Sequence, residues 1–273
     1  MFITLIDFIK YILLGLVQGI TEPLPISSSG HVIIFENIFN VYIPDSTNFN
    51  IFVNFGSLIA IIIFYRAFLK KILSGAFNYV FKKDKEGKDD FLYILLVIVA
   101  TIPAAIAGLF LKDIINERFS SLLSVGVALF ITGLLLLFIQ QAAKTANNEK
   151  ITLKTSIFMG LAQIIGLFPG ISRSGSTTTL GVANKTNLQA ALRFSFMMYI
   201  PVSFGALALG IFDLDTANTF IPGYIGAFIA SLIGTYLAIL FFFKLVKKNN
   251  LKYFGYYCLT ISMGILLYLA IIK

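Results

Sequence analysis

The chain has 273 residues, of which 58% are hydrophobic and only 12% charged, with a formal net charge of +8 and a mean hydropathy of +0.90. A soluble domain carries about twice this charged fraction, so the composition excludes one, and repeated apolar runs of about 20 residues indicate a multi-pass helical membrane protein. The basic excess lies between these runs, which favours membrane topology and contact with anionic lipid over nucleic-acid binding.

The first element is a short apolar run at about 2–20, and a second short run follows at about 29–40. The polar sequence GLVQGITEPLPISSSGH, from Gly15 to His31, joins them. Both runs are too short or too broken to span a bilayer alone, and irregular backbone at membrane depth persists only where it is buried in protein or lines a wet cavity. We therefore expect a re-entrant helical hairpin with its turn in the polar sequence.

Three runs long enough to span follow, at about 49–66, 91–111 and 122–141. The segment 66–90 between the first two is expected to be a loop. It carries a cluster of basic residues, namely Arg66, Lys70, Lys71, Lys82, Lys83, Lys85 and Lys88. A linker at 142–152 ends the first half.

The second half has the same order. Short runs at about 153–168 and 174–184 are joined by a second polar sequence, GLAQIIGLFPGISRSGS, which ends at Ser176. We expect a second re-entrant hairpin there. Three further spanning runs follow, at about 188–210, 222–243 and 253–271.

The two polar sequences align without a gap at a constant offset of 145 positions, as Gly15 and Gly160 show. The other identical pairs are Leu16/Leu161, Gln18/Gln163, Ile20/Ile165, Ile26/Ile171, Ser27/Ser172, Ser29/Ser174 and Gly30/Gly175. Interrupted segments at corresponding places in two halves are typical of a binding site at a repeat interface.

Charge gives the halves opposite orientations. If each hairpin returns to the side from which it starts, the basic segments 66–90, 142–154 and 244–252 share one side, predicted cytoplasmic, while Asp213, Asp215 and both termini face outward. We therefore predict a single all-α, polytopic membrane domain over 1–273 with two inverted-topology repeats, about 1–141 and 153–273. It should contain about six transmembrane helices and two re-entrant hairpins.

The two polar sequences differ where chemistry is expected. The first holds Glu22 and His31, the only histidine, and the second holds Arg173. Ionisable groups within a membrane are costly and usually functional, although each could instead be an interfacial or satisfied structural side chain. The guanidinium of Arg173 suits phosphoryl oxygens, and the glycine- and hydroxyl-rich turn around it offers N–H groups to an anion.

Glu22 could orient His31, accept a proton or hold a divalent cation, and Gln18 lies one helical turn earlier. Ser27, Ser28 and Ser29 could cap a helix or pack between spans, or one of them could form a nucleophile–base pair with His31. Together these groups predict a phosphate-shaped anion site that opens onto lipid, so the substrate should be an amphiphile.

These residues carry a resemblance to a known family. Gln18-Gly-Ile-Thr-Glu22-Pro-Leu-Pro-Ile-Ser27-Ser28-Ser-Gly-His31 and Pro169-Gly-Ile-Ser172-Arg173-Ser174-Gly-Ser-Thr177 resemble the two motifs of the undecaprenyl-diphosphate phosphatases of the bacitracin-resistance type. The resemblance covers essentially the whole chain. Two departures are Gln18, where many members have Glu, and Asn54, where Gln is expected.

The resemblance implies hydrolysis of undecaprenyl diphosphate to the monophosphate and phosphate. This would recycle the lipid carrier for cell-wall synthesis and confer bacitracin resistance. It also implies an outward-facing site in the bacterial cell membrane and a divalent cation, Mg²⁺ or Ca²⁺, at Glu22 with Gln18 as a further ligand. By position, the catalytic residues would be Glu22, Ser27, His31 and Arg173. The substrate-binding residues would be Gln18, Ser28, Ser172, Ser174 and Thr177.

Several alternatives stay open. The nucleophile could be Ser27 activated by His31, a water activated by His31, or His31 itself. A polyprenyl-phosphate flippase could use the same repeats and the same arginine, and a third interpretation is an inactive lipid-binding subunit. Lipid phosphatases that need two histidines are excluded, because the chain has one. Membrane lipids and a polyprenyl diphosphate are the expected partners, nucleic acid is not, and the chain could act alone or as a homodimer.

Overall fold

The computed structural model of the protein describes residues 5–41, 43, 46–212, 220–246 and 250–272, and within them the chain is helical without a β-strand. Asp213, Asp215, Lys247 and Lys248, on which part of the predicted topology rests, lie outside the described residues.

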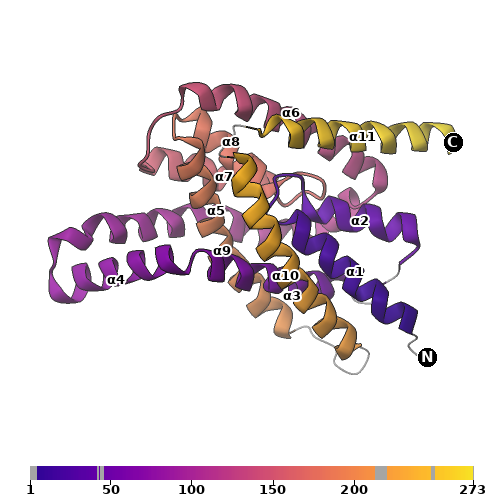
Figure 1. The fold of residues 1–273 in the computed structure, drawn as a ribbon, viewed down its shortest axis with the longest axis horizontal. Helices are drawn as coiled ribbons and strands as arrows, with labels where there is room; N and C mark the ends of the chain where they lie inside the picture. The colour runs from indigo at the N-terminus through magenta and orange to yellow at the C-terminus, as the bar shows by residue number, and fades with distance from the viewer. Residues whose placement is uncertain (1–4, 42, 44–45, 213–219, 247–249, 273) are drawn as a thin grey trace.

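The helices follow the predicted order in both halves (Figure 1). The first half comprises α1 (Leu5–Thr21), α2 (Ser28–Phe39), α3 (Ser46–Phe64), α4 (Arg66–Lys82), the 3₁₀ turn η1 (Lys85–Gly87), α5 (Lys88–Phe119), α6 (Leu122–Ala142) and the 3₁₀ turn η2 (Ala143–Thr145). The second half comprises α7 (Leu153–Ile165), α8 (Arg173–Ala183), α9 (Leu188–Phe212), α10 (Ile221–Val246) and α11 (Lys252–Ile272).

Length and apolarity confirm a multi-pass membrane protein. Among the described residues, five helices are long and apolar enough to cross a bilayer, and α3 with α4 would make a sixth although the two are bent by 74°. Large apolar side chains cover their outer faces, such as Phe110, which is 76% exposed. Such exposure is costly in water and suits contact with lipid tails. The shorter pairs α1–α2 and α7–α8 occupy the positions predicted for the two hairpins.

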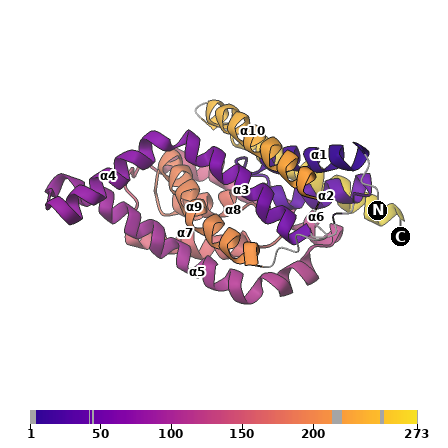
Figure 2. The same cartoon turned by 90° about the horizontal axis from the view of Figure 1, so that it is seen from below.

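The loop expected at 66–90 is wrong in its first part, because residues 66–82 form α4. Ile72 and Ala76 lie one turn apart and are buried where α4 packs along the start of α5, which stabilises the helix. Lys70 and Lys71 stay exposed. In Figures 1 and 2, α4 and the first part of α5 form an arm that projects from the other helices.

The two halves pack reciprocally. Helix α1 lies along α10, whereas its counterpart α7 lies along α5, and α6 lies beside α11 (Figures 1 and 2). The first two contacts use glycines at matching positions. A Cβ atom at Gly15 would lie 2.3 Å from the carbonyl oxygen of Ala227, and one at Gly160 would lie 2.5 Å from that of Ala100. The predicted inverted repeat requires this kind of reciprocity.

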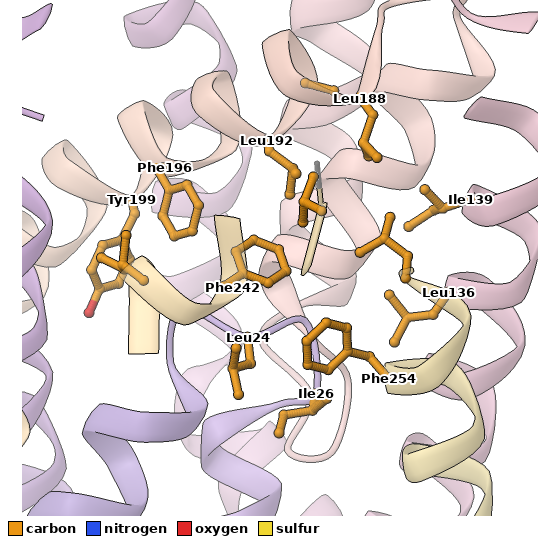
Figure 3. Close-up of a cluster of buried hydrophobic side chains, with 14 of the residues drawn as sticks. Leu24, Ile26, Leu136, Ile139, Leu188, Leu192, Phe196, Tyr199, Phe242 and Phe254 are labelled. Atoms are coloured by element: carbon orange, nitrogen blue, oxygen red, sulfur yellow. The ribbon is translucent and has the colours of Figure 1, made fainter. Parts of the chain in front are cut away.

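The core joins the first hairpin turn to the long helices. Figure 3 shows Leu24 and Ile26 of that turn among Leu136 of α6, Phe242 of α10 and Phe254 of α11. All of these side chains are buried. Because the turn is anchored by apolar side chains, the polar residues on either side of it are held in fixed positions.

Candidate active site

The turns of the two hairpins touch through glycine. A Cβ atom at Gly30 would lie 2.8 Å from Cα of Gly170, and Gly170 has φ of +93°, a conformation that disfavours other residues. Thr132 of α6 fixes the second turn, since its hydroxyl donates to the Gly170 carbonyl at 2.9 Å and accepts from the Ser172 N–H at 3.1 Å.

Matching serines cap the two inner helices. Ser172 accepts from the N–H of Gly175 at 3.0 Å at the start of α8, and Ser27 accepts from that of Gly30 at 3.4 Å at the start of α2. Ser27 itself has φ of 69°, an unfavourable conformation for a residue with a side chain. Backbone strain of this kind gathers at functional sites, and the surrounding contacts must hold it in place.

A cavity of about 260 Å³ lies between the hairpins. Most of its polar wall comes from the two repeated sequences: Glu22, Ser27, Ser28, Ser29, Gln163, Ser172, Arg173 and Ser174. Asn54 of α3 and Tyr199 and Ser203 of α9 complete the polar wall, and apolar residues such as Leu24, Ile51 and Leu167 form the rest.

An ion pair joins the two hairpins across this cavity. Nη2 of Arg173 lies 2.7 Å from Oε1 of Glu22, and the side chains are only 16% and 8% exposed. Arg173 also donates from Nη1 to the Ser195 carbonyl at 3.3 Å, and its Cζ lies 4.1 Å from the ring centre of Tyr199. The structure therefore brings together the two charged groups predicted to bind and process an acidic headgroup.

The other oxygen of Glu22 is also engaged. Oε2 accepts from Ser28 at 2.5 Å and from Nε2 of Gln18 at 2.8 Å. Nε2 of Gln18 also donates to Oδ1 of Asn54 at 2.6 Å, and the hydroxyl of Tyr199 donates to the Asn54 carbonyl at 3.0 Å. Asn54 thus orients Gln18, which gives a physical role to a position where the resemblance implied a different residue.

His31 lies on the far side of the Ser27 turn and is not part of the cavity wall. Its Nδ1 donates to the Ser27 carbonyl at 2.7 Å, and its Nε2 lies 2.9 Å from the hydroxyl of Tyr257 on α11. The two rings stack with centres 5.6 Å apart. In this geometry the imidazole fixes the main chain of Ser27, while the Ser27 hydroxyl contacts the Ser29 hydroxyl and the Gly30 N–H, each at 3.4 Å.

The remaining predicted residues lie beside Arg173. Hydroxyls of Ser172 and Ser174 are 3.3 Å apart on the cavity wall. Thr177 lies one turn behind, where its hydroxyl donates to the Arg173 carbonyl at 2.9 Å and contacts Ser195 at 2.7 Å. Thr177 therefore supports the arginine from behind and is not part of the cavity wall.

The cavity wall does not offer a preformed set of ligands for a cation. Within the described part of the chain, no three histidine, cysteine or acidic side chains are placed so that they could hold a metal ion together. Glu22 is the one carboxylate among the described residues of the cavity wall, and both of its oxygens are already bonded to protein groups. Such a donor set does not fit a resident divalent cation, which prefers several free oxygen ligands.

The motifs did not single out several residues of this site: Gln163, Ser195, Tyr199 and Tyr257. The repeat offset pairs Gln163 with Gln18, so a signal for it existed. The other three are ordinary side chains in apolar runs, and only the packing of α9 and α11 places them here.

Comparison with known proteins finds relatives over nearly the whole chain. Residues 11–264 match the family described as bacitracin resistance protein BacA. Undecaprenyl-diphosphatase 2 of Bacillus thuringiensis (strain Al Hakam) is 40% identical over 265 residues, which cover 96% of this chain and 97% of the relative. Undecaprenyl-diphosphatase of Oceanobacillus iheyensis is 39% identical over 269 residues, or 96% of each chain. The chain belongs to the bacitracin resistance protein BacA family.

Proposed function

We propose that this protein hydrolyses undecaprenyl diphosphate. Water supplies the oxygen that becomes bonded to the terminal phosphorus, the bond from that phosphorus to the bridging oxygen breaks, and undecaprenyl phosphate and inorganic phosphate leave. The observation that carries the proposal is the buried Arg173–Glu22 pair, 2.7 Å long, which joins the two hairpins on the wall of one cavity. The names of the relatives point to the same reaction.

When the diphosphate binds, its phosphate oxygens replace the Glu22 carboxylate as the acceptors of the Arg173 N–H groups. Its fork donates to Glu22 in the structure, and a phosphate group of higher charge competes for the same N–H groups. The start of α8, capped by Ser172, adds N–H groups and the positive end of the helix dipole. Charge that develops on the transferred phosphoryl group is then stabilised by groups already in place.

The displaced Glu22 is then free to accept a proton from the attacking group. That group is a water in the cavity or the Ser27 hydroxyl on the cavity wall. If Ser27 attacks, the terminal phosphoryl group passes to its Oγ as undecaprenyl phosphate leaves, and a water then hydrolyses this ester to release inorganic phosphate. His31 holds the Ser27 main chain, and its ring would have to turn to take a proton from the hydroxyl. A divalent cation, Mg²⁺ or Ca²⁺, that accompanied the diphosphate would be held by Glu22 and Gln18 and would offset negative charge on the phosphate groups, and no step proposed here depends on it.

The cellular role follows from the reaction. The protein would act in the bacterial cell membrane with its cavity open to the outer side, return the lipid carrier to cell-wall synthesis and confer resistance to bacitracin. These expectations rest on the relatives and on the charge distribution, because the loop with Asp213 and Asp215 lies outside the described residues.

The direct test is phosphate release by purified protein in detergent with undecaprenyl diphosphate. We expect turnover by the parent and a loss of at least about 1,000-fold in Arg173→Ala, since removing a preorganised charge from a dry site costs about this much. Arg118→Ala, at an exposed position on α5, is the matched control and should keep the parental rate. Parental turnover by a folded Arg173→Ala would remove this residue from the site.

A flippase for polyprenyl phosphate is the second candidate, and the reciprocal packing of α1 on α10 and α7 on α5 favours it. Detergent micelles have no sides, so the same assay separates the two functions. A flippase without hydrolytic activity would release no phosphate.

A further inference from the structure

Gln163 is a buried amide without a partner. It lies in the last turn of α7 and is 1% exposed, and among the described residues neither Nε2 nor Oε1 has a hydrogen-bond partner. A buried polar group left unpaired costs about 1–3 kcal/mol, so proteins seldom keep one without a use.

This amide belongs to the cavity wall that also holds Glu22 and Arg173. Other described side chains also have unpartnered buried atoms, among them Glu36, Tyr65, Tyr93, Thr178, Thr186 and Arg193. Within that described set, Gln163 is the one that lines this cavity.

Its repeat counterpart shows what the position can do. Gln18 occupies the same place in the first hairpin, and there the amide is fully used, because Nε2 donates to both Glu22 and Asn54. No carboxylate occupies the equivalent place in the second hairpin, since the offset of 145 positions pairs Glu22 with Leu167. The second amide therefore has unused hydrogen-bonding capacity at the wall of the cavity.

We propose that Gln163 binds the diphosphate headgroup, with Nε2 donating to a non-bridging phosphate oxygen. Gln163 is neutral, so it adds donors without competing with Arg173 for the negative charge. Together the two side chains would hold the headgroup from two elements, α7 and the start of α8. This assignment rests on the proposed function, because it takes the ligand to be a diphosphate.

The test compares Gln163→Met and Gln163→Glu with the parent, with the exposed Gln141→Met on α6 as matched control. Initial rates are measured with farnesyl diphosphate as a soluble probe, and the midpoint of thermal unfolding is measured with and without it. We expect kcat/KM to fall about 10- to 100-fold in Gln163→Met, the size of a hydrogen bond to a charged group. In Gln163→Glu the fall in kcat/KM should be larger, because the new carboxylate places a negative charge beside the headgroup.

Thermal unfolding separates binding from a structural role. Ligand-free Gln163→Met should melt at or above the parental temperature, since an apolar side chain of similar size replaces an unpaired amide. The rise in melting temperature that farnesyl diphosphate produces should be smaller in Gln163→Met than in the parent. A lower melting temperature without ligand, or a parental kcat/KM and a parental shift, would overturn the assignment.

The two proposals fail differently. If the parent shows the thermal shift but releases no phosphate from farnesyl or undecaprenyl diphosphate, the hydrolase proposal fails, and the binding assignment stands when that shift is smaller in Gln163→Met and fails when it is not. If the parent hydrolyses both and Gln163→Met matches it in rate and shift, the binding assignment fails alone.

Discussion

Glu22 and Arg173 form the charged pair on which the site depends. Burying two charges is costly, and their attraction offsets this cost only when the geometry is good and the remaining atoms are bonded. Here the contact is 2.7 Å, and Ser28, Gln18 and the Ser195 carbonyl bond the rest of the pair. Without substrate, Glu22 keeps the arginine compensated and in position.

Glu22→Gln should separate this role from catalysis. Loss of the carboxylate leaves Arg173 buried without an opposite charge, which costs about 3–5 kcal/mol, so the variant should unfold at a lower temperature in phosphate-free buffer. Inorganic phosphate can then take the vacant place, and we expect it to raise the melting temperature more in Glu22→Gln than in the parent.

Turnover of Glu22→Gln should fall by at least about 100-fold, because the proton acceptor is lost. Asp113→Asn, an exposed carboxylate on α5, serves as the control. A phosphate-induced shift no larger than the parental one would contradict the exchange of Glu22 for phosphate at Arg173.

Helix crossings set where these residues lie. Helix α1 carries Gln18 and ends just before Glu22, and α7 carries Gln163 and ends before the turn that leads to Arg173. Each packs closely against a helix of the other half at a glycine: α1 contacts α10 at Gly15, and α7 contacts α5 at Gly160. A change at either crossing should therefore move one side of the cavity against the other.

Gly15→Val and Gly160→Val should each destabilise the protein by at least about 2 kcal/mol and reduce turnover, since a Cβ atom would collide with the backbone of Ala227 or Ala100. The measurement is thermal unfolding together with phosphate release. Gly264→Val on α11 is the control, because no atom of the described residues lies within 4 Å of a Cβ there. A large loss of stability in one of the two glycine variants and none in the other would argue against reciprocal packing.

Sequence patterns predicted the positions of the helices better than they predicted the directions in which side chains point. Apolar runs and the repeat offset located the spans and both hairpins, and charge chemistry selected Glu22 and Arg173 although they are 151 positions apart. Helix α4 was missed because its lysines suggested a loop, while its apolar residues find a partner only in α5.

His31 shows that a sequence motif does not determine the direction of a side chain. The sequence places it four residues after Ser27, within reach of that serine, but the left-handed backbone of Ser27 turns the chain so that the ring faces Tyr257. A short motif does not determine such a turn. Gln163 was passed over for another reason, since its importance appears only when its lack of partners is seen.

The whole molecule can be understood as a scaffold that closes one cavity between two hairpins. Long apolar helices face lipid, the shared core holds the first turn, and Thr132 of α6 holds the second. Because both hairpins supply polar side chains to the cavity wall, neither half has a complete site by itself.

The most direct test of this account is an experimental structure with a non-hydrolysable methylene-bridged analogue of a prenyl diphosphate. We expect its phosphonate oxygens in the cavity between the two turns, bonded to Arg173 in place of Glu22 and to Nε2 of Gln163. A headgroup bound elsewhere, with the Arg173–Glu22 pair intact, would contradict it.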